Sequence, residues 1–173
     1  NVVRNIQMIF QDPAASLNPS FTVRRALADP QRVLRRDLGR DDIARRSEAM
    51  LERVGLPRAV LDRRAHELSG GQCQRVAIAR ALLVEPEVVI CDECTSALDV
   101  SVQTQILNLL RDLQAELGTA LLFISHDIGV VGYMADDILV MHGGRQVEAG
   151  PADELLARPR QEYTGRLIAA AYD

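Results

Sequence analysis

The sequence predicts an α/β fold with a mainly parallel sheet. Short apolar segments alternate with segments of helical periodicity, and the loops between them are short. Residues 88–91 form a fully apolar run with the length of a buried parallel strand, and residues 120–124 form a second one. Between them, residues 101–117 place leucine and isoleucine on one face, as an amphipathic helix does. Strand, helix and strand in this order are the unit from which parallel sheets are built.

The elements before this unit are a strand, a loop and a helical block. Residues 2–10 are mostly apolar and are expected to form the strand, which a Pro-containing loop follows. Residues 21–56 have helical spacing of apolar residues in two parts, which Gly39 separates. Pro30 is expected to interrupt the first part, because proline removes a helix hydrogen bond.

The remaining elements are expected on both sides of the central unit. Leu68–Gly71 is a turn that leads into a helix from about Gln72 to Leu83. After residue 124, a further helix is followed by a β-hairpin of residues 137–141 and 146–148, and by helices over residues 152–157 and 162–171.

Composition excludes several function classes. Hydrophobic residues make up 47% of the 173 residues, which is enough for a buried core, whereas aromatic residues make up only 3% and disfavour a base-stacking platform. The net charge of −4 gives no general attraction to nucleic acid or anionic lipid. All 20 basic residues are arginine, which excludes a Schiff-base lysine and the phosphate-binding lysine of a Walker A loop.

Other features concern origin and local charge. The chain starts with Asn rather than Met and is expected to be a processed chain or a fragment. No apolar run approaches the roughly 20 residues of a membrane helix, and three cysteines fit a reducing cytosol.

Residues 24–64 hold twelve arginines against seven acids, a balance of +5. This block is either a docking surface or a set of solvated helix faces.

Two segments carry the chemistry. The strand 88–91 ends in Asp92 and Glu93, as in the Walker B pattern of nucleotide hydrolases, where the first acid suits Mg²⁺ and the second suits an attacking water. The alternative is a solvated strand end.

Leu68–Gln72 combines a hydroxyl, two glycines and a helix start, so that backbone N–H groups are exposed for a phosphate. The alternative is an ordinary glycine-rich helix start.

Together these segments resemble the ATP-binding-cassette (ABC) ATPases. The order LSGGQxQR and then Walker B is similar to the signature pair of that family. Gln11 resembles the Q-loop glutamine, residues 96–99 resemble the D-loop, and His126 resembles the switch histidine. Within the family, the ATPases of dipeptide and oligopeptide importers are the most similar, on the segments Phe10–Pro13, Ser16–Pro19, Cys91–Glu93, Leu98–Gln103 and Tyr163-Thr164.

The resemblance implies a role for each candidate residue. Glu93 is expected to be the general base or to orient the attacking water, and His126 to contact the γ-phosphate and position that water. Gln11 senses the γ-phosphate and Mg²⁺, and Asp92 holds Mg²⁺ through water. Contacts with ATP held by a second cassette are expected from Ser69, Gly70, Gly71 and Gln72, and Asp99 would cross the same interface.

The resemblance also implies an organisation and partners. The expected parts are residues 1–20 (core strand and Q-loop), 21–67 (helical subdomain), 68–84 (signature motif and helix), 85–150 (Walker B, D-loop and switch histidine) and 151–173 (C-terminal helices). The cofactors would be ATP and Mg²⁺. The partners would be a second ATPase subunit, two transmembrane permease subunits and, indirectly, a substrate-binding protein, at the cytoplasmic face of the inner membrane and without nucleic acid.

Three departures from the family pattern are present. Walker A and the adenine-stacking aromatic precede the Q-loop in the family and are missing here, so the chain is expected to be an N-terminally truncated P-loop NTPase-like core that is inactive alone. Cys94 stands where the family usually has Pro, and Gln161-Glu162 where peptide importers often have His-Pro. Cys91 and Cys94 are nominally C-x-x-C, but no second ligand pair accompanies them.

Two other functions remain open. One is an ABC-type ATPase of DNA repair or chromosome organisation, although the short signature-to-Walker B spacing and the lack of heptads disfavour the coiled-coil insertions of that class. The other is a non-catalytic partner that supplies only the signature face in trans. Binding of ATP by the isolated chain would distinguish an enzyme from such a partner.

Overall fold

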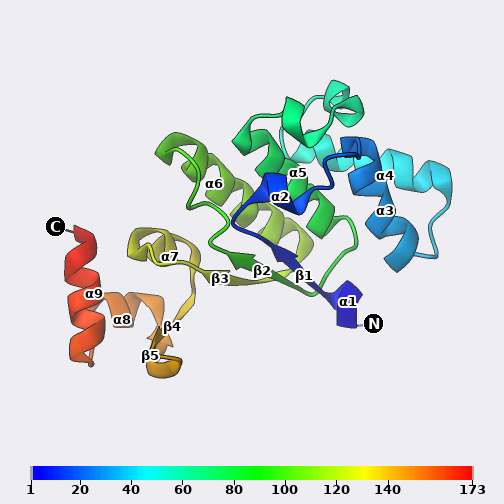
Figure 1. The fold of residues 1–173 in the computed structure, drawn as a ribbon. Coiled ribbons are helices and arrows are strands. Elements are labelled where there is room, and N and C mark those ends of the chain that lie inside the picture. The colour runs from blue at the N-terminus through cyan, green and yellow to red at the C-terminus, as the bar shows by residue number, and fades with distance from the viewer. Residues whose placement is uncertain (1, 173) are drawn as a thin grey trace. The chain divides into compact units, whose positions relative to one another are not determined.

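The computed structural model describes residues 2–172, which form two compact units that divide between Leu122 and Phe123. Figure 1 shows the elements of each unit. Those of the first are α1 (Val2–Asn5), β1 (Ile6–Ile9), α2 (Pro13–Ser16), α3 (Val23–Leu34), α4 (Arg40–Arg53), the 3₁₀ helices η1 (Arg58–Asp62) and η2 (Ala65–Glu67), α5 (Gly70–Leu82), β2 (Val88–Asp92), α6 (Val100–Leu117) and the start of β3 (Ala120–Ile124).

The described strands of the first sheet have the order β1-β2-β3. β1 and β2 are parallel, with Ile6 opposite Val88 and Ile9 opposite Cys91. Helices α5 and α6 run along one side of β1 and β2 (Figure 1). The α/β fold with a parallel sheet is therefore confirmed, and it places the ends of β1 and β2 at the same edge.

The expected strand over residues 2–10 is wrong in its first half, because Val2–Asn5 is helical. β2 begins at Val88, so the residues before Ile6 have no partner strand to pair with. Instead, Arg4 Nε donates to the Val84 carbonyl at 3.3 Å and Asn5 Nδ2 donates to Glu87 Oε1 at 2.8 Å. These polar side chains hold the turn against the end of the neighbouring strand.

The expected interruption at Pro30 is also wrong, since α3 runs through this residue. A proline inside a helix costs about 3 kcal/mol, but the helix buries Val23 and Leu27. The side chain of the buried Gln31 donates to the Leu27 carbonyl at 3.1 Å and to Ser47 Oγ of α4 at 3.0 Å. Packing and these tertiary bonds outweigh the local cost.

The two apolar strands are less buried than their sequences suggest. In β2 only alternate residues, Val89 and Cys91, are buried. In β3 no residue is buried, and Leu122 and Ile124 are 53% and 44% exposed. Alternating burial is typical of a sheet covered on one face, so the prediction of two fully buried strands is wrong.

Glu85 joins the end of α5 to the helical block. It follows α5 and has a left-handed backbone with φ of 55°. Its carboxylate contacts Arg46 Nη2 at 2.6 Å and Arg35 Nη1 at 2.5 Å. Partial burial raises the pKa of Glu85, but the hydrogen bond and charge of Arg46, together with those of Arg35, outweigh it and lower the pKa.

Glu85 is therefore expected to make stability depend on acid pH. Because its pKa is lower in the folded state, its contribution is complete above the ordinary value of about 4.5 and is lost as pH falls through the folded value. Glu85→Gln should lower the free energy of unfolding by about 1 kcal/mol at pH 7 and by less at pH 3. Urea unfolding of both proteins at several pH values measures this, and a difference that is constant with pH would contradict it.

The second unit begins within β3 and contains α7 (Ile128–Met134), β4 (Asp137–His142), β5 (Arg145–Pro151), α8 (Ala152–Ala157) and α9 (Glu162–Tyr172). The expected hairpin is confirmed: β4 and β5 are antiparallel, and Gly143 and Gly144 both have positive φ, as tight hairpin turns require. Ile138, Val140, Ala152 and Leu155 form the buried centre of this unit. Glu148 accepts backbone bonds from Arg160 and Gln161 and so anchors the segment before α9.

Candidate functional site

Gln11, Asp92 and Glu93 lie at the same edge of the sheet. Ile9 pairs with Cys91 in the parallel ladder, and Gln11 and Glu93 each follow these paired residues by two positions. Asp92 is the last residue of β2, and both acids are half-buried. The parallel register thus brings an amide and two carboxylates together from segments that are about 80 residues apart in the chain.

Ser96 connects Gln11 with the backbone of Glu93. Gln11 Nε2 donates to Ser96 Oγ at 3.2 Å. Ser96 Oγ in turn donates to the Glu93 carbonyl at 3.0 Å, and the Ser96 N–H donates to the same carbonyl at 3.1 Å. A change at Gln11 can therefore reach the turn that carries Glu93 through two hydrogen bonds.

The backbone of Glu93 is strained. Its φ is 45°, in the left-handed region that costs a non-glycine residue about 1 kcal/mol or more. The two bonds from Ser96 to its carbonyl hold this conformation. The strain turns the chain sharply after β2, directly at the second of the two acids.

The signature segment forms the capped start of α5. Ser69 is the N-cap: its Oγ accepts from the Gln72 N–H at 3.3 Å, and Gln72 Oε1 accepts from the Ser69 N–H at 3.0 Å. Gly70 and Gly71 are the first two helical residues, two positions earlier than the start expected at Gln72. Ser69 and Gly70 are exposed. Glycine at these positions leaves the backbone at the positive end of the helix dipole accessible to an anion.

The signature segment lies against the start of α6. A Cβ atom on Gly71 would come within 2.8 Å of Val102 Cγ1, and one on Gly70 would lie 3.9 Å from Leu98 Cδ2. Asp99, between these two contacts in sequence, is the N-cap residue of α6, but its exposed side chain makes no capping hydrogen bond. The structure therefore brings the predicted signature and D-loop residues together on one surface.

His126 belongs to the second unit and lies in the short loop between β3 and α7. Its side chain is exposed. Next to it, Asp127 caps α7 by accepting from the Val130 N–H at 3.2 Å. The expected role of His126 at a γ-phosphate stays a prediction.

The sequence did not reveal two contacts that hold the Q-loop. One is the bond from Gln11 to Ser96 described above. The other comes from Arg80 of α5, whose Nη1 donates to the Ser16 carbonyl at 2.6 Å and whose Nη2 contacts Ser16 Oγ at 3.3 Å. Burial lowers the pKa of Arg80. The only signal in the sequence was the position of Arg80 on the inner face of α5, and that position does not identify Ser16 as its partner.

The cysteines and acids do not form a metal-binding cluster in the described part of the chain. Among residues 2–172, no group of three or more His, Cys, Asp or Glu side chains is placed to hold a metal ion. Cys91 and Cys94 are buried free thiols, and their mutual hydrogen bond, followed by burial, raises the pKa of Cys91 well above its ordinary value. Such a thiol is a poor nucleophile and metal ligand. Mg²⁺ is usually bound through one or two carboxylates beside phosphate oxygens and water. Asp92 offers one carboxylate, and Gln11 offers an amide oxygen.

Comparison with known families identifies the class. A profile of the family described as "ABC transporter" matches residues 1–96. The chain therefore belongs to the ABC transporter family, as its motifs predict. Its structure is similar to that of cbiO1 from Clostridium perfringens, part of the ABC transporter complex cbiONQ, with a TM-score of 0.79 and 33% identity over 96% of this chain and 68% of that one.

The most similar relatives include ATP-binding proteins of peptide transport. The chain is 51% identical over 166 residues to the oligopeptide transport ATP-binding protein OppF of Salmonella typhimurium, covering 96% of this chain and 50% of the relative. It is 47% identical to the di/tripeptide transport ATP-binding protein DppF of Pseudomonas aeruginosa, covering 96% and 51%. The chain thus spans about half the length of these relatives. Within the described residues, no helix is both long and apolar enough to cross a bilayer.

Proposed function

We propose that these residues are the catalytic and helical part of an ATP-binding subunit that hydrolyses MgATP to energise peptide import. The observation that carries the proposal is the sheet edge where Gln11 and Glu93 meet through Ser96. An amide that is linked to the turn carrying a carboxylate can report the state of a phosphate, while the carboxylate orients water for attack on it. The similarity to oligopeptide and di/tripeptide transport proteins supports peptides as the transported substrate.

The roles follow from the chemistry of each side chain. Glu93 would accept the proton of the attacking water, and the rigid turn after β2 would keep its carboxylate at the correct place. Asp92 and the Gln11 amide oxygen would hold Mg²⁺, which supplies charge neutralisation for the phosphates. His126 would position the water from the γ-phosphate side. Catalysis then rests on positioning and charge stabilisation.

The signature surface would complete the site of a second subunit. The exposed start of α5 at Ser69, Gly70, Gly71 and Gln72 would bind the phosphates of ATP held by the partner cassette. Asp99 is exposed beside it and would reach across the same interface. ATP would therefore join two subunits, identical or not, and hydrolysis would separate them.

The complete assembly would include two permease subunits and, indirectly, a substrate-binding protein, at the cytoplasmic face of the membrane. The helical block would move with the Q-loop, because the loop that begins at Gln11 leads through α2 into α3 of this block. Arg80 of α5 holds the same loop at Ser16. This coupling would transmit the presence of the γ-phosphate to the permease.

Peptide uptake tests the proposal. A full-length subunit that contains these residues is expressed in cells that lack their own peptide-importing ATPase, and entry of a labelled tripeptide is followed. Uptake restored by the wild-type subunit and lost in its Glu93→Gln variant supports the proposal. ATP hydrolysis that DNA stimulates, without any peptide uptake, would favour the nucleic-acid class of ABC ATPases instead.

The basic start of α3 gives a prediction about docking of the permease. Arg24→Glu with Arg25→Glu is expected to weaken assembly several-fold, or to uncouple hydrolysis from transport, while ATP binding stays intact. Arg24 bonds Asp62 at 2.9 Å, and Arg25 bonds Asp29 at 3.2 Å while its guanidinium lies 3.7 Å from the Phe21 ring. Copurification with the permease measures the effect.

A charge-neutral control separates docking from folding. Gln at both positions removes the positive charges without placing like charges against Asp62 and Asp29. If the Gln variant copurifies and transports normally, these arginines only stabilise the helical block, and the docking role is refuted.

A further inference from the structure

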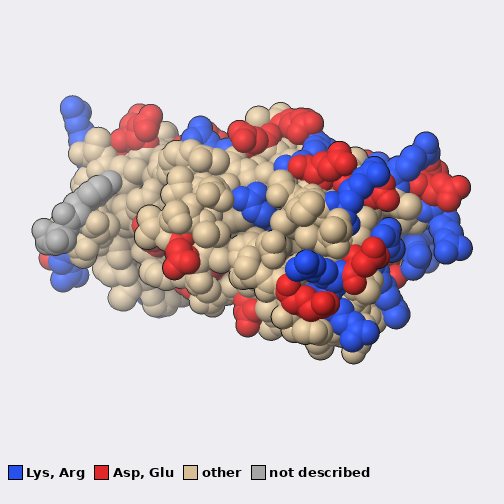
Figure 2. All heavy atoms as spheres, turned by 90° about the horizontal axis from the view of Figure 1, so that it is seen from above, with Lys and Arg blue, Asp and Glu red and all other residues tan. Residues whose placement is uncertain are grey.

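The connection between α3 and α4 forms a pocket with arginines around it. The pocket has a volume of about 570 Å³ and is lined by Arg32, Arg36, Leu38, Arg40 and Ile43. None of these residues belongs to the motifs of the nucleotide site. Figure 2 shows arginine and acidic side chains crowded at the right of the view, the side on which α3 and α4 lie in Figure 1.

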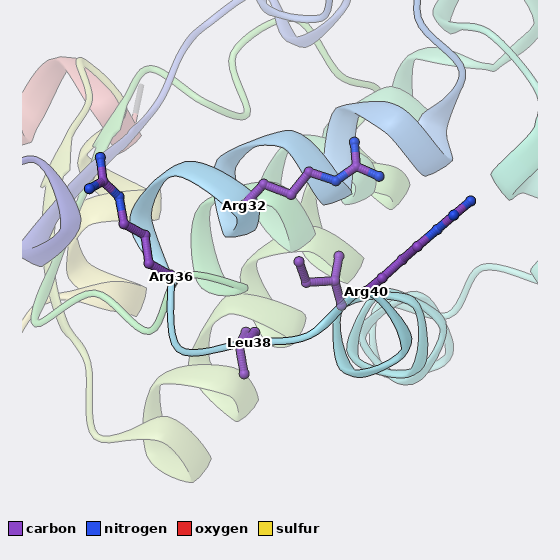
Figure 3. Close-up of a pocket in the computed structure, with 5 residues that line it drawn as sticks. Arg32, Arg36, Leu38 and Arg40 are labelled. Carbon is purple, nitrogen blue, oxygen red and sulfur yellow. The ribbon is translucent and has the colours of Figure 1, made fainter.

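The pocket combines positive charge with an apolar floor. Ile43 is 5% exposed and Leu38 is half-buried. Arg32 and Arg40 extend to the same side of the pocket, whereas Arg36 points the other way across the turn (Figure 3). An occupant would therefore meet apolar surface in the middle and guanidinium groups on both sides.

Most acids near the pocket already have partners. Asp29 contacts both Arg25 and Arg32, and Asp37 bonds Arg35, which lowers the pKa of Asp37 to about 2. In contrast, no hydrogen bond or ion pair within residues 2–172 involves the side chain of Arg36 or of Arg40.

The remaining acids leave an excess of positive charge. Asp42 is bonded to the Gly39 N–H and pairs with Arg45. Asp41 alone has no such partner among the described residues, so two unpaired arginines face one unpaired acid. The pocket is thus complementary to negative charge.

The backbone favours carboxylates over a phosphate as the source of that charge. A phosphate site at a helix start uses free backbone N–H groups. Here the first turn of α4 carries Asp41 and Asp42, whose carboxylates place negative charge at this helix start, and Asp42 Oδ2 also accepts from the Gly39 N–H at 3.3 Å. The attraction therefore comes from arginine side chains, which bind carboxylates in a bidentate manner. The apolar floor adds a place for an apolar side chain.

We propose that this pocket docks an acidic peptide segment of a partner protein. An apolar side chain of the segment lies on Leu38 and Ile43, and flanking carboxylates pair with Arg36 and Arg40. The surface is separate from the nucleotide site and does not depend on the proposed transport function.

A defined peptide tests the proposal. The probe is a fluorescein-labelled hexapeptide with the sequence Glu-Leu-Glu-Glu-Leu-Glu, and fluorescence anisotropy measures its binding to a full-length subunit that contains residues 1–173. Arg36→Gln with Arg40→Gln should weaken binding at least five-fold, and Leu38→Gln about three-fold. Arg63→Gln with Arg64→Gln is the matched control, since both side chains are exposed in the same unit and outside the pocket. This control should bind within two-fold of the wild type.

Hydrogen exchange locates the bound peptide. Protection on binding should be confined to residues 32–43, and circular dichroism verifies that each variant is folded. Equal loss in the pocket variant and in the Arg63/Arg64 control would show general attraction to arginine and would overturn the proposal. It would also be overturned if the wild type binds phosphatidylglycerol vesicles or inorganic pyrophosphate through Arg36 and Arg40 but not the peptide.

Discussion

Glu93→Gln in a full-length subunit is expected to lower the rate of ATP hydrolysis by about 10²–10⁴-fold, the usual contribution of a positioned general base. The amide has the shape of the carboxylate but cannot accept a proton from water. The backbone of residue 93 should keep its left-handed conformation, because both bonds from Ser96 go to the main-chain carbonyl. ATP binding and closure of the dimer should therefore persist while turnover stops.

The measurement compares turnover with binding. Phosphate release gives the rate of hydrolysis, and gel filtration with ATP shows whether the variant accumulates as a dimer. Ser96→Ala is a useful companion, since it removes the link between Gln11 and Glu93 but keeps the carboxylate. A Glu93→Gln subunit that hydrolyses ATP at nearly the wild-type rate would refute the assignment of the base, and His126 would be the next candidate.

Local patterns predicted the parts of this site that depend on neighbours in sequence. The apolar run before Asp92 and Glu93 indicated a strand with acids at its carboxyl end, and the structure confirms the strand. Ser69 and the glycines after it indicated a helix start, which the reciprocal bonds of Ser69 and Gln72 confirm. In both cases the residues that form the sequence pattern and those that form the predicted element lie within five or six positions of each other in the chain.

Features that depend on tertiary packing were predicted less well. Whether β3 is buried depends on the layers that cover it, and its apolar sequence cannot report them. Residues 2–5 are apolar enough for a strand, but a strand needs a partner that β2 does not extend to provide. The bond from Gln11 to Ser96 joins residues 85 positions apart. The resemblance to ABC ATPases placed both motifs in one site but gave no contact between these side chains.

Gly71→Ala is expected to destabilise the first unit by about 1–2 kcal/mol, which is roughly 5–30-fold in the folding equilibrium. The added methyl would lie 2.8 Å from Val102 Cγ1, closer than two carbon atoms can approach, so α5 and α6 must move apart. Alanine is otherwise the better helix former by about 1 kcal/mol, which offsets part of the cost. Because Asp99 precedes α6 directly, the same shift should also displace the D-loop and lower hydrolysis in a full-length subunit.

Two further substitutions isolate the contact as the cause. Gly70→Ala adds the same methyl one residue earlier, but its nearest neighbour is Leu98 at 3.9 Å, an ordinary van der Waals distance, so it should be neutral or slightly stabilising. Val102→Ala removes the methyl groups that Gly71→Ala would meet, and the double variant should recover most of the lost stability. Urea unfolding of the four variants and the wild type measures these differences. If Gly70→Ala costs as much as Gly71→Ala, or if Val102→Ala fails to rescue it, then the close approach of α5 to α6 is not what requires glycine at position 71.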